Sequence, residues 1–282
     1  MLRLRRTSRE RLVLSIVGIA LGIAWFFPIL WMFFSSLQPN SELLIYPPRI
    51  IPRVVTLENF RTILFSGRGV NVGRSFLISV FLSSMVTAGV LVTATPAAYA
   101  FARLHFKGRD VLFWLIVATL ILPVQMFIVP VYLLLDRLHL LNTFWAIILP
   151  PIGPAFGVFL LRQFMLTIPD ELEDAAKIDG CSPLRFLVQI VAPLMRPPLV
   201  SLAILTFLGI WNDLLWPMLV IYDSKIMPLQ PALARIRGEY HGTFEAGTIM
   251  AGAFIAAIPV LVIFVFANRY IVKAISTSGI SR

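Results

Sequence analysis

Polar side chains inside apolar runs mark the places where this chain can do chemistry. The stretch GIWNDLLWP sets an amide, Asn212, and a carboxylate, Asp213, in a long apolar run. Such groups are costly at membrane depth and usually face a cavity or a partner. Trp211 and Trp216 flank them, and an indole face stacks on a sugar ring while Asn and Asp bond hydroxyl groups. The four residues can therefore line a path for a polyhydroxylated solute. Alternatively, Asn212 and Asp213 satisfy backbone groups freed near Pro217, or bond between helices.

Two further polar side chains lie within apolar runs. Gln125 follows closely on Pro123, and Tyr99 stands in the string TPAAYAFAR. Each is a candidate for the same solute path. The alternative for Gln125 is that it satisfies backbone groups near the proline. The alternative for Tyr99 is packing between helices.

The sequence carries no pattern for covalent or metal chemistry. The phosphate loop GxxxxGK[ST] is absent, so the chain is not expected to bind or hydrolyse ATP. His105, His139 and His241 are far apart and none has ligand spacing. The single cysteine, Cys181, excludes an intrachain disulfide and a cysteine metal cluster. We therefore expect neither catalysis nor a bound cofactor.

The longest charged interruption in the second half of the chain covers residues 168–198, IPDELEDAAKIDGCSPLRFLVQIVAPLMRPP. Pro169 suits a first helical position, which makes Thr167 or Ile168 the expected N-cap. Four acidic residues follow within two turns, where they favour the positive end of the helix dipole. This pattern predicts a short helix.

A second short helix is expected to follow. Gly180 predicts a left-handed turn that stops the first helix. Ser182 and Pro183 suit the N-cap and first residue of the next helix, which Pro193 ends or kinks. Each helix carries an apolar stripe, Ile168, Leu172, Ala175 and Ala176 on the first and Leu184, Leu187, Val188 and Val191 on the second. So short a hairpin cannot bury both stripes itself, and one interpretation is a re-entrant or surface hairpin packed on the chain's own membrane helices.

The composition defines the setting of these residues. Of 282 residues, 59% are hydrophobic and 13% charged, and the mean hydropathy is +0.88. Soluble domains have roughly 25% charged residues. The chain is therefore expected to be a polytopic membrane protein. Its net charge of +10 bears on membrane orientation and gives no indication of nucleic-acid binding.

Six apolar runs are long enough to cross a membrane, which takes about 20 residues each. The predicted spans are residues 12–37, 74–102, 111–135, 143–164, 199–222 and 246–272. Pro28 is expected to kink the first span, and Pro123 and Pro130 to break the third. The first run is too long for the apolar core of a signal peptide, so it is expected to remain uncleaved. The predicted fold is an all-α polytopic membrane protein with six transmembrane helices and a helical hairpin, in the loop 165–198, between spans four and five.

Basic residues predict the orientation. Six spans place both termini on one side, and Lys and Arg are more numerous in residues 1–11, the loop after the second span, the hairpin and the tail 273–282 than in the other loops. By the positive-inside rule, both termini and the hairpin are cytoplasmic. The polar segments 38–73 and 223–245 then face the other side, and the phrase LENFRTIL in the first has helical spacing suited to a membrane surface.

The hairpin resembles the coupling loop of ABC importer permeases. That pattern is Glu-Ala-Ala, three residues, Gly, nine residues, Ile, two residues, Pro, and here DAAKIDG is followed nine residues later by IVAP. Asp174 stands in place of the glutamate, with Glu173 beside it. The resemblance implies that the hairpin docks on a cytosolic ATP-hydrolysing subunit. The ATPase-coupling residues it implies are Leu172, Glu173, Asp174, Ala175, Ala176, Ile178, Asp179, Gly180, Ile190 and Pro193.

The resemblance extends over most of the chain. The strings TPAAYAFARLHFKGRD, ILPVQMFIVPVY, LHLLNTFWAIILPPIGPAFGVFLLRQF and WNDLLWP are similar to the sugar-importer branch, in particular to the maltose-type second permease subunit. It implies a cell-membrane complex with a homologous sister permease, two ATPase copies that hold ATP and Mg, and an extracytoplasmic sugar-binding protein. It also implies that the sister subunit holds most of the sugar, and that the tail can reach between the ATPase subunits.

Three alternatives stay open. Within the same family, glycerol 3-phosphate is the rival substrate to a sugar or polyol. A secondary transporter would show an internal repeat and an ion site at mid-membrane, and neither is clear here. A membrane-embedded enzyme would need a convergent acid, base or metal set, and the sequence suggests none.

Overall fold

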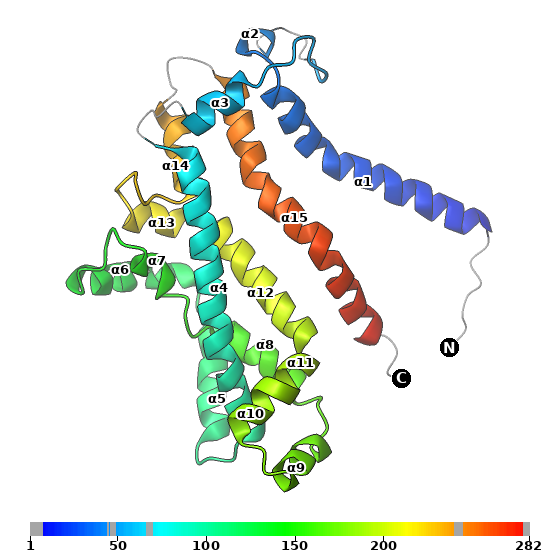
Figure 1. The fold of residues 1–282 in the computed structure, drawn as a ribbon, viewed down its shortest axis with the longest axis vertical. Helices are drawn as coiled ribbons and strands as arrows, with labels where there is room; N and C mark the ends of the chain where they lie inside the picture. The colour runs from blue at the N-terminus through cyan, green and yellow to red at the C-terminus, as the bar shows by residue number, and fades with distance from the viewer. Residues whose placement is uncertain (1–7, 44, 46–48, 66–69, 240–244, 279–282) are drawn as a thin grey trace. The chain divides into compact units, whose positions relative to one another are not determined.

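The computed structural model describes residues 8–43, 45, 49–65, 70–239 and 245–278. All regular elements in these ranges are helices (Figure 1), as the predicted fold class requires. The chain divides into two compact units. The first contains the residues up to Val72 together with Leu233–Ile258, and the second contains Gly73–Ala232 and the residues from Pro259 onward.

The first unit is built from α1 (Ser8–Ser36), α2 (Asn40–Leu43), α3 (Glu58–Phe65), most of α14 (Leu229–Glu239) and the start of α15 (Ala246–Ser278). Helix α1 runs continuously through Pro28, and α3 confirms the helix predicted from LENFRTIL. Phe254 of α15 lies 5.0 Å from Phe33 and 6.4 Å from Phe60 between ring centroids. Aromatic packing thus joins three helices of this unit.

A buried asparagine closes the polar end of the first unit. The Asn59 side-chain nitrogen donates to the carbonyls of Ser36, at 2.9 Å, and Gln38, at 2.7 Å. Its oxygen accepts from the Thr248 hydroxyl at 3.4 Å. Gly247 lies so close that a Cβ there would come within 2.5 Å of the Asn59 nitrogen. A glycine is required at this position to let α15 approach α3.

The second unit is centred on α4 (Val72–Arg103). The buried residues of α4 recur every four positions, which places them on one face: Leu82, Val86, Val90, Ala94 and Ala98. Around it lie α5 (Arg109–Ala118), the 3₁₀ turns η1 (Thr119–Ile121) and η2 (Val124–Phe127), α6 (Ile128–Arg137), α7 (Trp145–Ile148), α8 (Ala155–Met165), α12 (Arg196–Trp211) and α13 (Leu215–Val220). A Cβ on Gly157 of α8 would meet both Ala94 and Leu202 at 3.2 Å, so small residues let α8 pack closely between α4 and α12.

Some predicted spans are single long helices in the structure, and others are bent or broken. Three are long and apolar enough to cross a membrane, Val13–Ser36, Val72–Arg103 and Ala246–Phe266. Two bent pairs raise the number to five if each is one span, Arg109–Ile121 with Val124–Arg137 at 96° and Pro183–Leu194 with Arg196–Trp211 at 83°. The predicted span 143–164 consists of α7, a turn and the 11-residue α8, which is too short to cross alone. Six spans therefore remain a prediction.

Prolines account for much of this segmentation. Pro123 separates η1 from η2, as predicted, because it lacks the N–H that would continue the helix. The predicted break at Pro130 is wrong. Pro130 lies in the first turn of α6, where a missing N–H costs nothing. The predicted span 199–222 is divided between α12 and α13 at residues 212–214.

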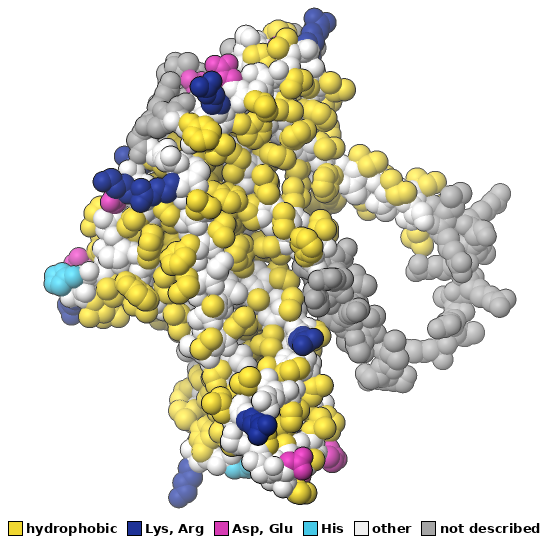
Figure 2. Space-filling model, in the orientation of Figure 1, with side chains coloured by type: hydrophobic (Ala, Val, Ile, Leu, Met, Phe, Trp, Pro, Cys, Tyr) yellow, Lys and Arg dark blue, Asp and Glu magenta, His cyan; other side chains and the backbone are white. Residues whose placement is uncertain are grey.

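Several predicted segments extend outside the described residues. These are parts of the N-terminus 1–11, the polar segments 38–73 and 223–245, and the tail 273–282. Within the second unit, Figure 2 shows hydrophobic side chains over much of the visible surface, with charged side chains near the hairpin at the lower end and at the left, in the region of α6. That distribution is typical of a membrane protein with polar regions outside the lipid.

Candidate functional site

The hairpin is formed by α9 (Glu171–Ile178), α10 (Pro183–Phe186), the π-helical turn η3 (Leu187–Val191) and α11 (Ala192–Leu194). The predicted N-cap at Thr167 or Ile168 is wrong, because Asp170 holds that position. Its carboxylate makes no cap bond and pairs instead with Arg103 at the end of α4. The residues ahead of α9 are therefore fixed by a tertiary contact.

The turn of the hairpin follows its local chemistry. Gly180 has φ of 72°, and the amides of Gly180 and Cys181 donate to the carbonyls of Lys177, at 3.0 Å, and Ala176, at 2.9 Å. These are the two hydrogen bonds of a Schellman motif. Ser182 accepts from the Arg185 amide at 3.4 Å, with a proline at the start of the helix. The predicted helix stop and second cap are both confirmed.

The second half of the hairpin differs from the expectation at Pro193. The chain stays helical through Pro193, directly after the π-helical turn, and bends by 83° between α11 and α12. Helix α12 begins with Arg196, followed by Pro197 and Pro198. The bend falls at Met195, between the two helices, and both prolines lie in the first turn of α12, where their missing N–H groups cost nothing.

Exposed apolar side chains distinguish the outer face of the hairpin. Ile178 is 87% exposed, and Leu184 and Val188 are 69% and 60% exposed. The inner face is formed by Ala176, Phe186, Leu187 and Val191, which are buried. The predicted stripes are therefore each split between the two faces. Among the other residues implied in coupling, Glu173 and Ile190 are half-buried and the rest are exposed: Leu172, Asp174, Ala175, Asp179, Gly180 and Pro193.

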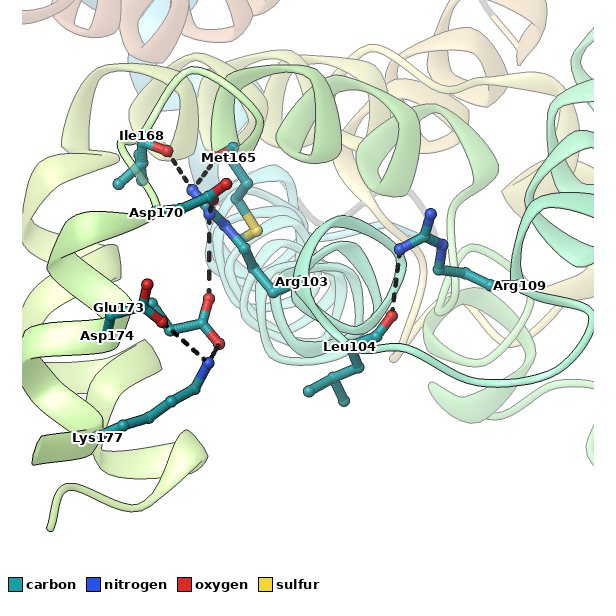
Figure 3. A network of polar contacts seen from close by, with 9 residues as sticks. All are labelled: Arg103, Leu104, Arg109, Met165, Ile168, Asp170, Glu173, Asp174 and Lys177. Atoms are coloured by element: carbon teal, nitrogen blue, oxygen red, sulfur yellow. Dashed lines mark hydrogen bonds and ion pairs between the residues drawn. The ribbon is translucent and has the colours of Figure 1, made fainter.

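Arg103 joins the hairpin to the membrane helix α4 (Figure 3). Its side chain is only 7% exposed. One guanidinium nitrogen donates to the Asp170 carboxylate and lies 4.0 Å from Glu173, and the other donates to the carbonyls of Ile168 and, at 3.0 Å, Met165. Sequence reasoning counted Arg103 only among the basic residues that set orientation. The available signal was the acidic cluster before Ala175, which required a basic partner.

Ion pairs within α9 surround this contact. Lys177 lies 3.2 Å from Glu173 and 3.6 Å from Asp174. The hydrogen bond to Glu173 is the main reason that the pKa of Lys177 is raised above its ordinary value. Lys177 therefore stays charged and supports the helix by contacts one turn apart.

A second arginine strengthens the same end of the unit. Arg162 of α8 donates to the Phe101 carbonyl at 3.1 Å, and its guanidinium carbon lies 3.9 Å from the Phe113 ring centroid. This cation–π contact and hydrogen bond join α8 to α4 and α5.

Tyr99 lies against the hairpin. It is buried, and its ring is 6.3 Å from that of Phe186 in α10. With Arg103, Glu173 and Lys177 it lines a pocket of about 230 Å³. The structure thus brings Tyr99 together with the coupling residues, and its place in a solute path stays a prediction.

The other candidate path residues lie at and near the helix break after α12. Trp211 is buried, with its ring 6.1 Å from Phe207 in a stacked arrangement and 5.4 Å from Phe76 edge-on. These contacts are typical of helix packing. Gln125 lies separately, exposed in η2.

The polar groups at the break bond mainly to backbone. Asn212 donates to the Leu208 carbonyl at 2.9 Å, and the Asp213 carboxylate accepts from the Trp216 amide at 3.3 Å. The Trp216 indole donates to the Ala146 carbonyl at 2.9 Å, which fastens α13 to α7. These bonds are those of the alternative in which Asn212 and Asp213 satisfy freed backbone groups. Since Asn212 is exposed, a further role in a solute path stays a prediction.

Apolar helices with proline breaks and a polar hairpin at one end define a multi-pass helical membrane protein. Residues 91–277 match the family of the binding-protein-dependent transport system inner membrane component. The chain belongs to this family and is a permease component of binding-protein-dependent transport.

Relatives and a solved structure agree with this assignment. The chain is 33% identical to the arabinooligosaccharides transport system permease protein AraQ of Halalkalibacterium halodurans, over 98% of this chain and 99% of that protein. It is 35% identical to the sn-glycerol-3-phosphate transport system permease protein UgpE of Salmonella typhi, over 93% of this chain and 94% of that protein. The fold matches a chain of a bacterial ABC transporter involved in import of the acidic polysaccharide alginate, with a TM-score of 0.79 at 22% identity over 94% of this chain and 98% of that chain.

Proposed function

We propose that the chain is the membrane permease subunit of an ATP-driven ABC importer that moves a sugar or related polyol delivered by an extracytoplasmic binding protein. The family membership and a relative named for oligosaccharide transport support the proposal. The observation that carries the coupling role is the outer face of the hairpin. Ile178, Leu184 and Val188 are apolar and exposed in the part of the chain where the coupling pattern lies. Apolar side chains exposed outside the lipid are typical of a protein interface.

The hairpin is well placed to transmit movement. It follows α8 directly along the chain and leads through α11 into α12, so a displacement of the hairpin acts on membrane helices at both of its ends. In the proposed mechanism, ATP and Mg are bound by the partner ATPase copies, whose closure moves the cytoplasmic hairpin. A homologous second permease completes the solute path, and both termini are cytoplasmic.

A neutral sugar fits the candidate path better than a phosphorylated polyol. Phosphate recognition favours Arg or Lys donors, whereas the candidate path residues are neutral or acidic: Gln125, Trp211, Asn212, Asp213, Trp216 and Tyr99. Glycerol 3-phosphate remains the second candidate, because a relative of similar identity is named for its transport.

Purification from native membranes in mild detergent tests the assembly. We expect an ATP-binding subunit and a second multi-span permease to copurify, and ATP-driven uptake after reconstitution with the binding protein. Recovery of the chain alone, active with an ion gradient and without ATP, would favour a secondary transporter.

The variant Ala175→Arg tests the hairpin interface. Ala175 is exposed, whereas Ala176 is only 6% exposed and an arginine there would also disturb the internal packing. We expect Ala175→Arg to leave the chain in the membrane and to lower ATP-driven uptake by about tenfold or more, with Ala175→Ser as the matched control. Normal uptake by Ala175→Arg would contradict the proposal.

A further inference from the structure

Arg103 connects α4 to a short segment that lies more than 60 residues later in the sequence. It is the last residue of α4, and it bonds to the end of α8 through Met165, to the linker through Ile168, and to the start of α9 through Asp170. The side chain is almost fully buried although the Asp170 side chain is 86% exposed. Figure 3 shows the guanidinium lying beside the Met165 and Ile168 carbonyls and the Asp170 carboxylate.

The chemistry of these partners suits a guanidinium. The carbonyls at the end of α8 carry the negative end of its dipole, and the acids at the start of α9 add formal negative charge. A planar fork with five donors can bond to a carboxylate and to carbonyls at once, whereas a lysine ammonium is a single point charge.

The folding of α9 itself does not depend on this arginine. Lys177 pairs with Glu173 and Asp174 inside the helix, and the Schellman turn at Gly180 closes its end. Arg162 separately joins α8 to α4 and α5. Removal of Arg103 is therefore expected to detach the base of the hairpin from α4 while the helices on both sides persist.

We propose that Arg103 is a positioning residue that fixes the coupling hairpin to α4, so that movement of the hairpin by the ATPase is transmitted to this central membrane helix as well as along the chain. The inference rests on the proposed function. It adds a third, non-covalent route to the two covalent connections through α8 and α12. Since α4 is the helix on which the second unit packs, this contact sets how far a hairpin displacement reaches into the unit.

The experiment uses the complete complex with its binding protein in liposomes, and measures uptake and ATP hydrolysis on the same preparation. Arabinooligosaccharides and sn-glycerol 3-phosphate serve as the probe solutes, and the one that the wild type takes up is used for the variants. Arg103→Met keeps much of the side-chain volume and removes every donor. Arg103→Lys keeps the charge, and Asp170→Asn removes one acceptor charge from a side chain that is 86% exposed.

Arg109→Gln is the matched control. Arg109 lies at the same end of the unit, and its ion pair, at 3.1 Å, is with its neighbour Asp110 in α5. We expect this variant to keep wild-type uptake per ATP hydrolysed.

The expected result is a loss of coupling. Arg103→Met should assemble and hydrolyse ATP but take up about tenfold less solute per ATP, Arg103→Lys should recover part of that ratio, and Asp170→Asn should lower it severalfold. If Arg103→Met fails to assemble, a reduced ratio in Asp170→Asn still supports the proposal. Wild-type ratios in Asp170→Asn, or in Arg103→Met, would overturn it while leaving the proposed function intact. Absence of ATP-driven uptake in the wild type would instead overturn the proposed function.

Discussion

Two residues, Gly247 and Asn59, fix the packing of α15 against α3 in the first unit. Gly247 lets the start of α15 approach Asn59, whose amide donates to the carbonyl of Ser36 at the end of α1 and to that of Gln38. A buried amide that loses such bonds costs about 1–3 kcal/mol. The hydrogen bonds of Asn59 therefore require a residue without a Cβ at position 247.

Gly247→Ala is expected to lower stability by about 1–3 kcal/mol, because the added Cβ would displace the Asn59 amide. The measurement is the midpoint of thermal unfolding in detergent. Gly209→Ala is the control, since a Cβ there meets no atom within 4 Å. Equal midpoints for the two variants would contradict this account of the glycine.

Local sequence patterns predicted the turn and the second cap of the hairpin but not the start of its first helix. The turn at Gly180 and the cap at Ser182 follow from short-range rules, and the structure confirms both. Asp170 was assigned to the inside of the helix because its partner, Arg103, is 67 residues away. The acidic cluster indicates that a basic partner is needed, but local sequence does not say which residue supplies it.

At the scale of elements, the hairpin combines a rigid inner face with an uncovered outer face. Its buried residues pack toward Tyr99 of α4, while Ile178, Leu184 and Val188 are left exposed. Each apolar stripe predicted from periodicity is divided between the buried and the exposed face. The packing of α10 against α4 decides which residues of each stripe are buried, and hydrophobic periodicity carries no information about that packing.

The hairpin turn provides a prediction at this scale. Gly180→Ala places a Cβ at φ of 72°, where the left-handed conformation costs about 1–2 kcal/mol. We expect the variant to shift α10 relative to α9 and to lower uptake per ATP hydrolysed. Gly108→Ala carries a similar strain, at φ of 83°, outside the hairpin. If both variants lose coupling equally, general instability rather than hairpin geometry is the cause.

Membrane helices were predicted less completely than the hairpin. Three apolar runs form single long helices, whereas the other three are bent or divided. Hydropathy detects apolar length but not the helix break at Asn212 and Asp213, whose side chains bond to the backbone, or the bend at Met195. The location of the apolar segments was therefore predictable, and their internal breaks only partly.

For the whole molecule, chemical labelling of one native side chain tests the orientation in the membrane. Cys181 is the only cysteine, and it lies partly exposed in the hairpin turn. We expect a membrane-impermeant maleimide to label it in inside-out vesicles and not in intact cells, because the hairpin is assigned to the cytoplasm. Cys181→Ser supplies the blank. Labelling of Cys181 only from outside would reverse the proposed topology.

The proposed coupling role requires that the hairpin contact an ATP-binding partner. A photo-crosslinking amino acid in place of Ile178, the most exposed apolar side chain of the hairpin, tests it in native membranes, with the same group in place of Val92, 71% exposed in α4, as control. We predict a covalent adduct with an ATP-binding subunit from position 178 and none from position 92. Adducts from position 178 that contain no ATP-binding protein, or equal yields from both positions, would contradict the proposed coupling role.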